Sequence, residues 1–155
     1  MKLRSLMISF TVILGLAFTT VGLIKPPTQN VFKMTITIEG IKTSKGKIKL
    51  SLQSDEKLFN TEKGIKKSRW KVAKAKSGQV SLSFNKVKPG IYAIAVFHDE
   101  NDNDSLDKDL FEAPTEPFGF SNNPKIKQSP PKFTEVAFDH NKKQSLTIKL
   151  NHPIN

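Results

Sequence analysis

The chain of 155 residues contains no cysteine. Disulfide bonds are therefore excluded, and so is a lipid attached to a cysteine at a signal-peptide junction. A thiol nucleophile is excluded for the same reason. If the protein is exported, an apolar core or a bound ion must hold its fold instead of disulfides.

The chain also lacks the short motifs that carry common enzyme chemistry. It has no Gly-x-Ser-x-Gly turn, no His-Glu-x-x-His pair and no glycine-rich loop that would cradle phosphate. Its three histidines, His98, His140 and His152, are far apart in sequence and do not predict a clustered metal site. We therefore expect a protein that is not an enzyme.

A long apolar run occurs once, at the N-terminus. Residues 1–24 combine Lys2 and Arg4 with a following apolar stretch, which predicts a signal peptide. The alternative is an uncleaved anchor, because the stretch approaches the length that spans a bilayer. Residues 25–31 form a Pro-rich tether, and residues 32–152 are expected to form one domain that is periplasmic or secreted. Membrane contact is expected only through the N-terminal segment, if it is uncleaved.

Charges of the two signs are distributed unevenly along the chain. Between Asp99 and Glu116 there are eight acidic residues and one lysine, a net charge of −7. The rest of the chain after Gly22 has 22 basic and 6 acidic residues, a net charge of +16. This separation predicts a cation site in the acidic segment and a surface elsewhere that attracts anionic envelope polysaccharide, lipid or protein. Nucleic acid is not expected as a partner of an exported protein.

Seven of the basic residues lie between Lys63 and Lys76, around Trp70. They could contact anionic lipid headgroups or polysaccharide. The simpler explanation is an exposed edge strand that lysines guard against pairing with another chain.

Alternation of apolar and polar residues predicts strands along most of the chain after residue 31. These strands cover residues 32–38, 48–52, 80–84, 91–97, 133–138 and 146–150. We expect the first two to form a hairpin, and the fourth, which is apolar on both faces, to be a central strand. No amphipathic helix is predicted. The pattern indicates an all-β fold, namely an antiparallel β-sandwich of about seven strands, immunoglobulin-like or transthyretin-like.

The exception to this regular spacing is the connection over residues 99–131. A connection of this length without regular structure is usually functional or disordered. This one contains Phe111, Phe118 and Phe120, so we expect one long ordered loop that packs against the domain as a lid.

Three motifs in this half of the chain resemble an exported bacterial family known as domain of unknown function 2141. The first is the Pro-Gly-x-Tyr of Pro89–Tyr92, and the second is the His-Asp-x-Asn-x-Asn pattern that ends at Leu-Asp in His98–Asp107. The third, Pro-x-Glu-x-x-Gly-Phe-Ser-Asn-Asn, covers Pro114–Asn123. Asp104 and Glu112 stand where the family commonly has glycine. The resemblance implies an exported single domain, and it implies no activity because the family is uncharacterised.

Oxygen-bearing side chains occupy every second position from Asp99 to Asp107. Alternating Asp and Asn residues are typical of loops that bind Ca²⁺. In the register of a twelve-residue calcium loop, Asp99, Asn101 and Asn103 take positions one, three and five. Ser105 then offers its carbonyl at position seven, and Asp107 takes position nine.

Two positions of this register depart from the usual calcium loop. Position six, normally glycine, is Asp104, and position twelve, normally a bidentate glutamate, is Leu110. Glu112 or Glu116 could fold back and complete the ligand set. Without the twelfth glutamate we expect weak binding, with a dissociation constant of about 0.1 to 1 mM, which suits an exported protein. The alternative is a solvated acidic turn in which Asp and Asn cap their own backbone.

His98 ends the predicted central strand and directly precedes the loop. It could be a metal ligand or a general base, which leaves a small hydrolase that uses His98 and loop carboxylates as an alternative function. The simpler role is a hydrogen bond that fixes the loop.

A short segment after the loop combines small polar groups with an aromatic ring. Its residues are Gly119, Phe120, Ser121, Asn122 and Asn123. Such a combination can hold a ligand, or it can anchor the lid to the sandwich. The sequence therefore predicts an exported, non-enzymatic β-sandwich with a calcium loop, and the metal-free alternative is a structural or adhesion module.

Overall fold

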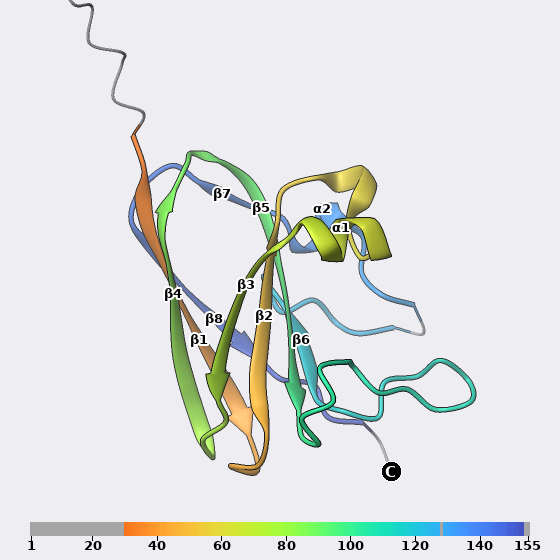
Figure 1. Ribbon diagram of the computed structural model, residues 1–155. Helices are drawn as coiled ribbons and strands as arrows, with labels where there is room; N and C mark the ends of the chain where they lie inside the picture. Colours follow the sequence, from red (N-terminus) through yellow and green to blue (C-terminus); the bar gives the residue numbers. More distant parts are fainter. Residues whose placement is uncertain (1–29, 128, 154–155) are drawn as a thin grey trace, which may run out of the picture.

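The computed structural model describes residues 30–127 and 129–153 (Figure 1). The predicted signal peptide and nearly all of the Pro-rich tether lie outside these residues. Within the described part, no helix is long and apolar enough to cross a membrane.

Eight strands and two short α-helices follow one another within the described residues. In order they are β1 (Phe32–Ile41), β2 (Lys47–Gln53), a 3₁₀ turn (Glu56–Leu58), α1 (Glu62–Lys67), β3 (Arg69–Lys74), β4 (Gly78–Val87), β5 (Gly90–Asp99), β6 (Phe118–Phe120), α2 (Phe133–Val136), β7 (Phe138–His140) and β8 (Gln144–Lys149).

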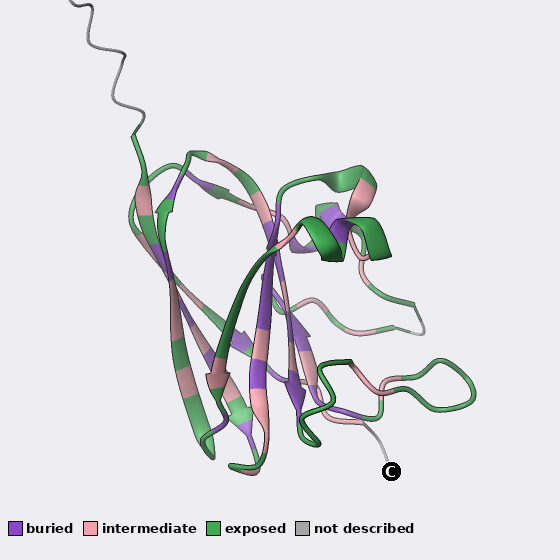
Figure 2. Ribbon diagram, in the orientation of Figure 1, coloured by how far each residue is buried: buried purple, intermediate pink, exposed green. Residues whose placement is uncertain are grey.

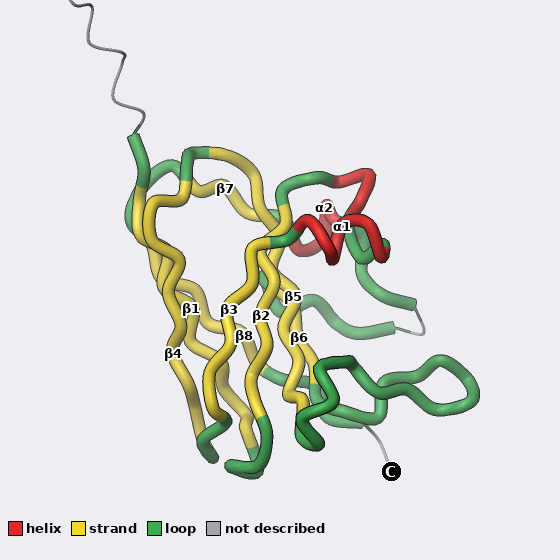
Figure 3. Tube along the Cα trace, viewed as in Figure 1, coloured by secondary structure: helices red, strands yellow, loops and turns green. Residues whose placement is uncertain are grey.

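The strands form two sheets that face each other (Figure 3). One sheet has the order β4-β1-β8, and the other has the order β3-β2-β5-β6, with β7 paired to the beginning of β5. The predicted all-β sandwich is confirmed. All pairs between these strands are antiparallel except β1 with β8, which is parallel and was not predicted.

The core lies between the sheets and follows from the period-two pattern of the strands. Met34, Ile36 and Ile38 on β1 are fully buried, and Ile48 and Leu50 on β2 face the same space. Less buried polar residues alternate with them along β1. Figure 2 shows buried and less buried residues as alternating bands along the strands. Each such apolar side chain contributes roughly 1.5–3 kcal/mol when it is fully buried.

The predicted hairpin of β1 with β2 is wrong, because the two strands belong to different sheets. β1 pairs with β4 and β8, whereas β2 pairs with β3 and β5. Alternation shows which face of a strand is buried, but both strands bury a face in the same core. The pattern therefore could not distinguish a hairpin from a chain that crosses between the sheets.

A helical turn replaces part of one predicted strand. Residues 133–138 were predicted as one strand, but Phe133–Val136 is the helix α2 and only Phe138–His140 is a strand. Phe133 and Val136 are both buried and three residues apart, the spacing of one helical turn.

The helix α1 was also missed, although its sequence carries a start signal. The Thr61 hydroxyl accepts a hydrogen bond from the Gly64 amide at 3.1 Å, as a helix N-cap does. Glu62 lies in the first turn, and Lys66 and Lys67 lie in the last, which suits the helix dipole.

The central position of β5 explains why both of its faces are apolar. Ile94 and Val96 face the core between the sheets, while Ala93 and Ala95 belong to a second apolar cluster on the outer face. Phe120 of β6 joins that cluster. The long connection predicted as one loop is therefore divided by β6, which pairs with β5 and holds the connection against the sheet.

Gly46 provides a test of how closely the turn before β2 approaches the end of β5. Its φ is +67°, and a Cβ at this position would lie 1.9 Å from the Asp99 carbonyl oxygen. Gly78 has a φ of +95° but open space around it. We expect Gly78→Ala to destabilise the fold by about 1 kcal/mol through backbone strain alone. Gly46→Ala should cost about 1–3 kcal/mol more, because the backbone must also move apart.

Urea unfolding of the two variants checks this expectation. Equal losses of unfolding free energy for Gly46→Ala and Gly78→Ala would show that the turn does not press against Asp99.

Candidate functional site

The acidic loop begins where β5 ends, and its first residue is buried. The Asp99 side chain is fully buried at the last position of the strand. Its Oδ1 accepts the Asn103 amide at 3.1 Å, and its Oδ2 accepts the Asp104 amide at 2.9 Å. One carboxylate thus folds the chain back on itself, and its oxygens meet the amides of the fifth and sixth residues of the predicted register.

Three further loop side chains converge on one point. The side-chain amides of Asn101 and Asn103 donate to the two carboxylate oxygens of Asp107 at 2.7 and 2.8 Å. The Asn101 amide oxygen also accepts the Asn103 backbone amide at 3.1 Å, and the Asn103 amide oxygen accepts that of Ser105 at 2.8 Å. The structure therefore brings positions three, five and nine together, with the asparagines exposed to solvent.

The backbone takes the sharp turn that the calcium-loop register requires. Asp104, at position six, has a φ of 68°, the left-handed conformation that glycine adopts freely. Ser105 follows it and is exposed, while Leu110, at position twelve, is 99% exposed and contributes no ligand atom. In the described residues, no three His, Asp or Glu side chains meet in a metal-holding group.

The two glutamates that could complete the ligand set lie in different places. Glu116 is buried, and its carboxylate accepts the backbone amides of Glu100 at 2.8 Å and of Asp107 at 3.1 Å. It therefore braces the beginning of the loop against its end. Glu112 lies on the next turn, where its exposed carboxylate bonds Lys108 at 2.8 Å. The structure does not bring Glu112 to the other candidate ligands.

Lysines of β2 compensate part of the acidic charge, which the sequence did not reveal. Lys47 bonds Asp102 at 3.1 Å, and Lys49 bonds the Asp104 carboxylate at 2.7 Å and its carbonyl at 2.9 Å. The hydrogen bond to Asp102 raises the pKa of Lys47, and the hydrogen bond from Lys49 lowers the pKa of Asp104. The electrostatic repulsion among the carboxylates of the loop is therefore weaker than the composition of the loop suggests.

His98 is fully buried and holds the turn before β2. Its Nε2 donates to the Lys45 carbonyl at 2.7 Å, and its backbone amide donates to the Pro117 carbonyl at 2.8 Å. Its Nδ1 has no hydrogen-bond partner in the described part of the chain, and the Glu100 carboxylate lies 3.5 Å away. A side chain without solvent access cannot act as a general base on an outside substrate, so this geometry favours the structural role of His98.

Residues 119–123, which follow the acidic loop, anchor the long connection to the sandwich through buried contacts. Gly119 and Phe120 are buried in β6. The Ser121 hydroxyl accepts the Ile94 amide at 3.0 Å and donates to the Val136 carbonyl at 2.5 Å. These contacts connect β5 with α2 beneath the outer surface.

The two asparagines that follow bind backbone groups in the same way. Asn122 donates its side-chain amide to the Ala137 carbonyl at 2.8 Å, and Asn123 donates to that of Thr147 at 2.9 Å. Both have positive φ values, which asparagine tolerates better than most residues. The polar groups of the segment are thus engaged with the protein itself, which favours anchoring over ligand binding.

The sequence did not predict a large apolar groove beside the acidic loop. It has a volume of about 1140 Å³ and lies on the outer face of the β3-β2-β5-β6 sheet. Ala95 and Phe97 of β5, Trp70 and Val72 of β3, and Phe118 of β6 line it. Two features of the sequence could have revealed this groove. They are the apolar second face of β5 and the alternation of Trp70 and Val72 with basic residues on β3.

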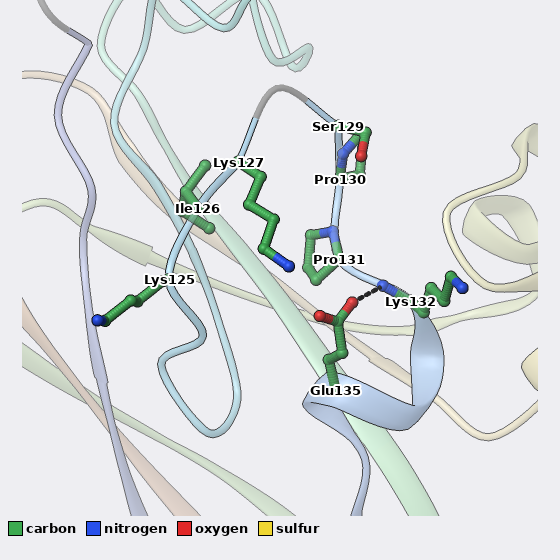
Figure 4. Close-up of a pocket in the computed structure, with 8 residues that line it drawn as sticks. All are labelled: Lys125, Ile126, Lys127, Ser129, Pro130, Pro131, Lys132 and Glu135. Carbon is green, nitrogen blue, oxygen red and sulfur yellow. Dashed lines mark hydrogen bonds between the residues drawn. The ribbon is translucent and has the colours of Figure 1, made fainter.

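A smaller hollow of about 410 Å³ lies between residues 125–127 and 129–135 (Figure 4). Figure 4 shows Lys127 extending toward Pro131, whereas Lys125 points away. The Glu135 carboxylate is already bonded to the Lys132 backbone amide at 2.7 Å. The hollow presents no set of converging polar groups that would define a ligand.

Comparison with known proteins gave one match. A model of the bacterial family described as "Uncharacterized protein conserved in bacteria" (DUF2141) matches residues 36–149. No curated protein matches the chain. No solved structure matches it either.

The brace formed by Glu116 can be tested against Glu112. Glu116→Gln keeps one acceptor oxygen but loses the charge, so a buried backbone amide is left unsatisfied. We expect a loss of about 1–3 kcal/mol in the free energy of unfolding. Glu112→Gln should change it little, because exposed ion pairs contribute little to stability. Chemical denaturation measures both, and similar small losses would contradict the bracing role.

Proposed function

The chain belongs to the DUF2141 family of uncharacterized bacterial proteins, and we propose that it is an exported, non-enzymatic β-sandwich of the cell envelope that binds Ca²⁺. The bound ion would lie in the loop from Asp99 to Asp107. The family description names no activity, so the proposal depends on the loop itself.

The observation that carries the proposal is the backbone register set by Asp99. A calcium loop needs its first carboxylate turned inward and a sharp left-handed turn at its sixth residue, so that alternate side chains face one centre. Asp99 is buried and accepts the amides of Asn103 and Asp104. Asp104 has the required positive φ. Asn101, Asn103 and Asp107 already face one another across the turn.

An ion would take the place of the two amide-to-carboxylate bonds around Asp107. Ca²⁺ binds six to eight oxygens at 2.3–2.6 Å. An amide oxygen has two lone pairs, so Asn101 and Asn103 can accept their backbone bonds and still bind a cation. Asp99, Asp107 and the Ser105 carbonyl are the other protein donors, and water must supply the rest. This incomplete set supports weak binding.

Export and partners form the second part of the proposal. The pattern of residues 1–24 supports export to the periplasm or the medium, where Ca²⁺ reaches the concentrations that a weak site requires. The strongly basic remainder of the chain supports an anionic envelope polysaccharide, lipid or protein as the partner.

A metal-free structural or adhesion module is the second candidate function. It is favoured by the lysines that pair with Asp102 and Asp104, since these pairs lower the charge available to a cation. The buried position of His98 gives the hydrolase alternative no support.

Calorimetric titration of Ca²⁺ into chelator-treated protein distinguishes these functions. We expect one site with a dissociation constant of about 0.1 to 1 mM. Ten millimolar Ca²⁺ should then stabilise the fold by roughly 1.4–2.7 kcal/mol, seen as a higher melting temperature. Asp107→Asn should weaken binding about tenfold or more, which corresponds to about 1.4 kcal/mol.

Asp102→Asn is the matched control for Asp107→Asn. It removes the same charge from the same loop, but Asp102 lies at position four and faces Lys47. Equal weakening by both variants would show that Ca²⁺ binds only to diffuse acidic charge. Absence of heat, together with an unmoved melting temperature, would favour the metal-free module.

A further inference from the structure

The groove on the outer face of the β3-β2-β5-β6 sheet has the form of a ligand site. The floor of the groove is low at Ser51 and Ala95, because these two small side chains are directly paired on neighbouring strands. The larger side chains of Trp70, Phe97 and Phe118 rise around this floor. Ligand pockets in proteins are typically apolar hollows of about 300–1000 Å³, and this groove, at about 1140 Å³, is slightly larger.

Exposed apolar side chains gather around the groove. The described chain has seven large hydrophobic residues that are exposed, and four of them line the groove. These four are Ile65, Trp70, Val72 and Phe111. Phe111 is 90% exposed and comes from the acidic loop, whereas the others come from α1 and β3. Figure 1 shows α1 and the loop projecting from the same side of the sheet. A concentration of exposed apolar area at one place indicates an interaction site.

The few polar groups of the floor are already satisfied within the protein. The Gln53 side-chain amide donates to the Ser51 hydroxyl at 3.2 Å, and the Gln53 amide oxygen accepts the Asn60 backbone amide at 3.4 Å. The strand backbones beneath are paired with one another. A peptide buried here would leave its own backbone groups unpaired, at a cost in binding free energy. A hydrocarbon chain has no such groups, so the floor favours an acyl chain.

The charges around the groove favour an anionic end on that chain. Six charged residues line it, four lysines and two acids, which is a net charge of +2. Asp104 and Glu112 are bonded to Lys49 and Lys108, respectively. Lys66 is bonded to Glu62, which lies outside the lining of the groove. The remaining positive charge of the lining is therefore carried by Lys127, and a carboxylate or phosphate group would be attracted to it.

We infer that this groove binds a single-chain amphiphile, namely a long acyl chain that ends in an anionic group. The acyl chain lies over Ala95 between Trp70 and Phe118, and its anionic end is held by Lys127 at the rim. This function does not depend on Ca²⁺ in the acidic loop, although Lys49 touches both sites through Asp104 and the Trp70 ring.

Trp70 is the one tryptophan of the chain, so its fluorescence reports on the groove directly. The experiment titrates the protein, in a chelating buffer, with 11-bromoundecanoate below its micelle-forming concentration. Bromine quenches tryptophan at contact distance, and we expect saturable quenching. The neutral 11-bromoundecanol should bind at least threefold more weakly. Quenching that rises linearly without saturation, or equal affinity for both compounds, would overturn the inference.

Two variants test where the acyl chain lies, and a third is a control for nonspecific effects of a substitution on binding. Ala95→Phe fills the floor, and Val72→Glu places a charge on the wall at a residue that is 50% exposed and therefore tolerant of change. Each should weaken 11-bromoundecanoate binding about tenfold. Ile91→Phe adds a ring to the same strand at an exposed residue that does not line the groove, and it should leave binding unchanged.

Circular dichroism and melting temperature establish that each variant is folded. If Ala95→Phe fails to fold, Val72→Glu alone decides. Unchanged binding in a folded Val72→Glu variant would contradict the proposed position.

A further titration tests whether the acyl chain comes from a free fatty acid or from a membrane lipid. Vesicles of a brominated phosphatidylglycerol replace the free fatty acid. Quenching by the free acid alone indicates a soluble ligand, and quenching by the vesicles as well indicates that the groove takes acyl chains from a lipid surface. Quenching by vesicles but not by the free acid would overturn the single-chain inference.

Discussion

Two buried carboxylates determine the shape of the acidic loop. Asp99 bonds two amides inside the loop, and Glu116 bonds one amide at each of its ends. A buried carboxylate without partners would be very costly, so these bonds must persist for the fold to persist. Because Asp99 ends β5, the loop is fixed to the central strand of the sheet, and Gly46 allows the neighbouring turn to come close.

Lys49 connects this loop with the groove. Its ammonium group bonds Asp104 and lies 5.9 Å from the centre of the Trp70 ring and 5.6 Å from that of Phe97. Its side chain is only 12% exposed, whereas the Asp104 side chain that it bonds is 71% exposed. A ligand in the groove and a cation in the loop would both touch the neighbourhood of this lysine. The two proposed sites are thus neighbours on one surface, although the ligands proposed for them have opposite charges.

The sequence predicted those features that follow from local patterns. Period-two alternation identified the strands that build the core, such as β1 and β5, and the Asp/Asn spacing indicated where the acidic loop lies. It could not predict the partners of β1 and β2, because a strand buries the same face in a hairpin and in a crossover. Nor could it predict that Lys47 and Lys49 compensate part of the negative charge of the loop, since these contacts join residues more than fifty positions apart.

The Asp/Asn spacing leaves ion binding undecided for a physical reason. The same side-chain oxygens that bind Ca²⁺ also close turns by accepting backbone amides, so one pattern serves both roles. The hydrogen bonds of Asp99, Asn101 and Asn103 reduce the entropy that an ion would have to overcome, because the turn is already folded. The lysines act in the opposite direction by lowering the negative potential. The weak Ca²⁺ affinity that we propose for this loop therefore depends on the balance of these two effects, both of which the fold fixes.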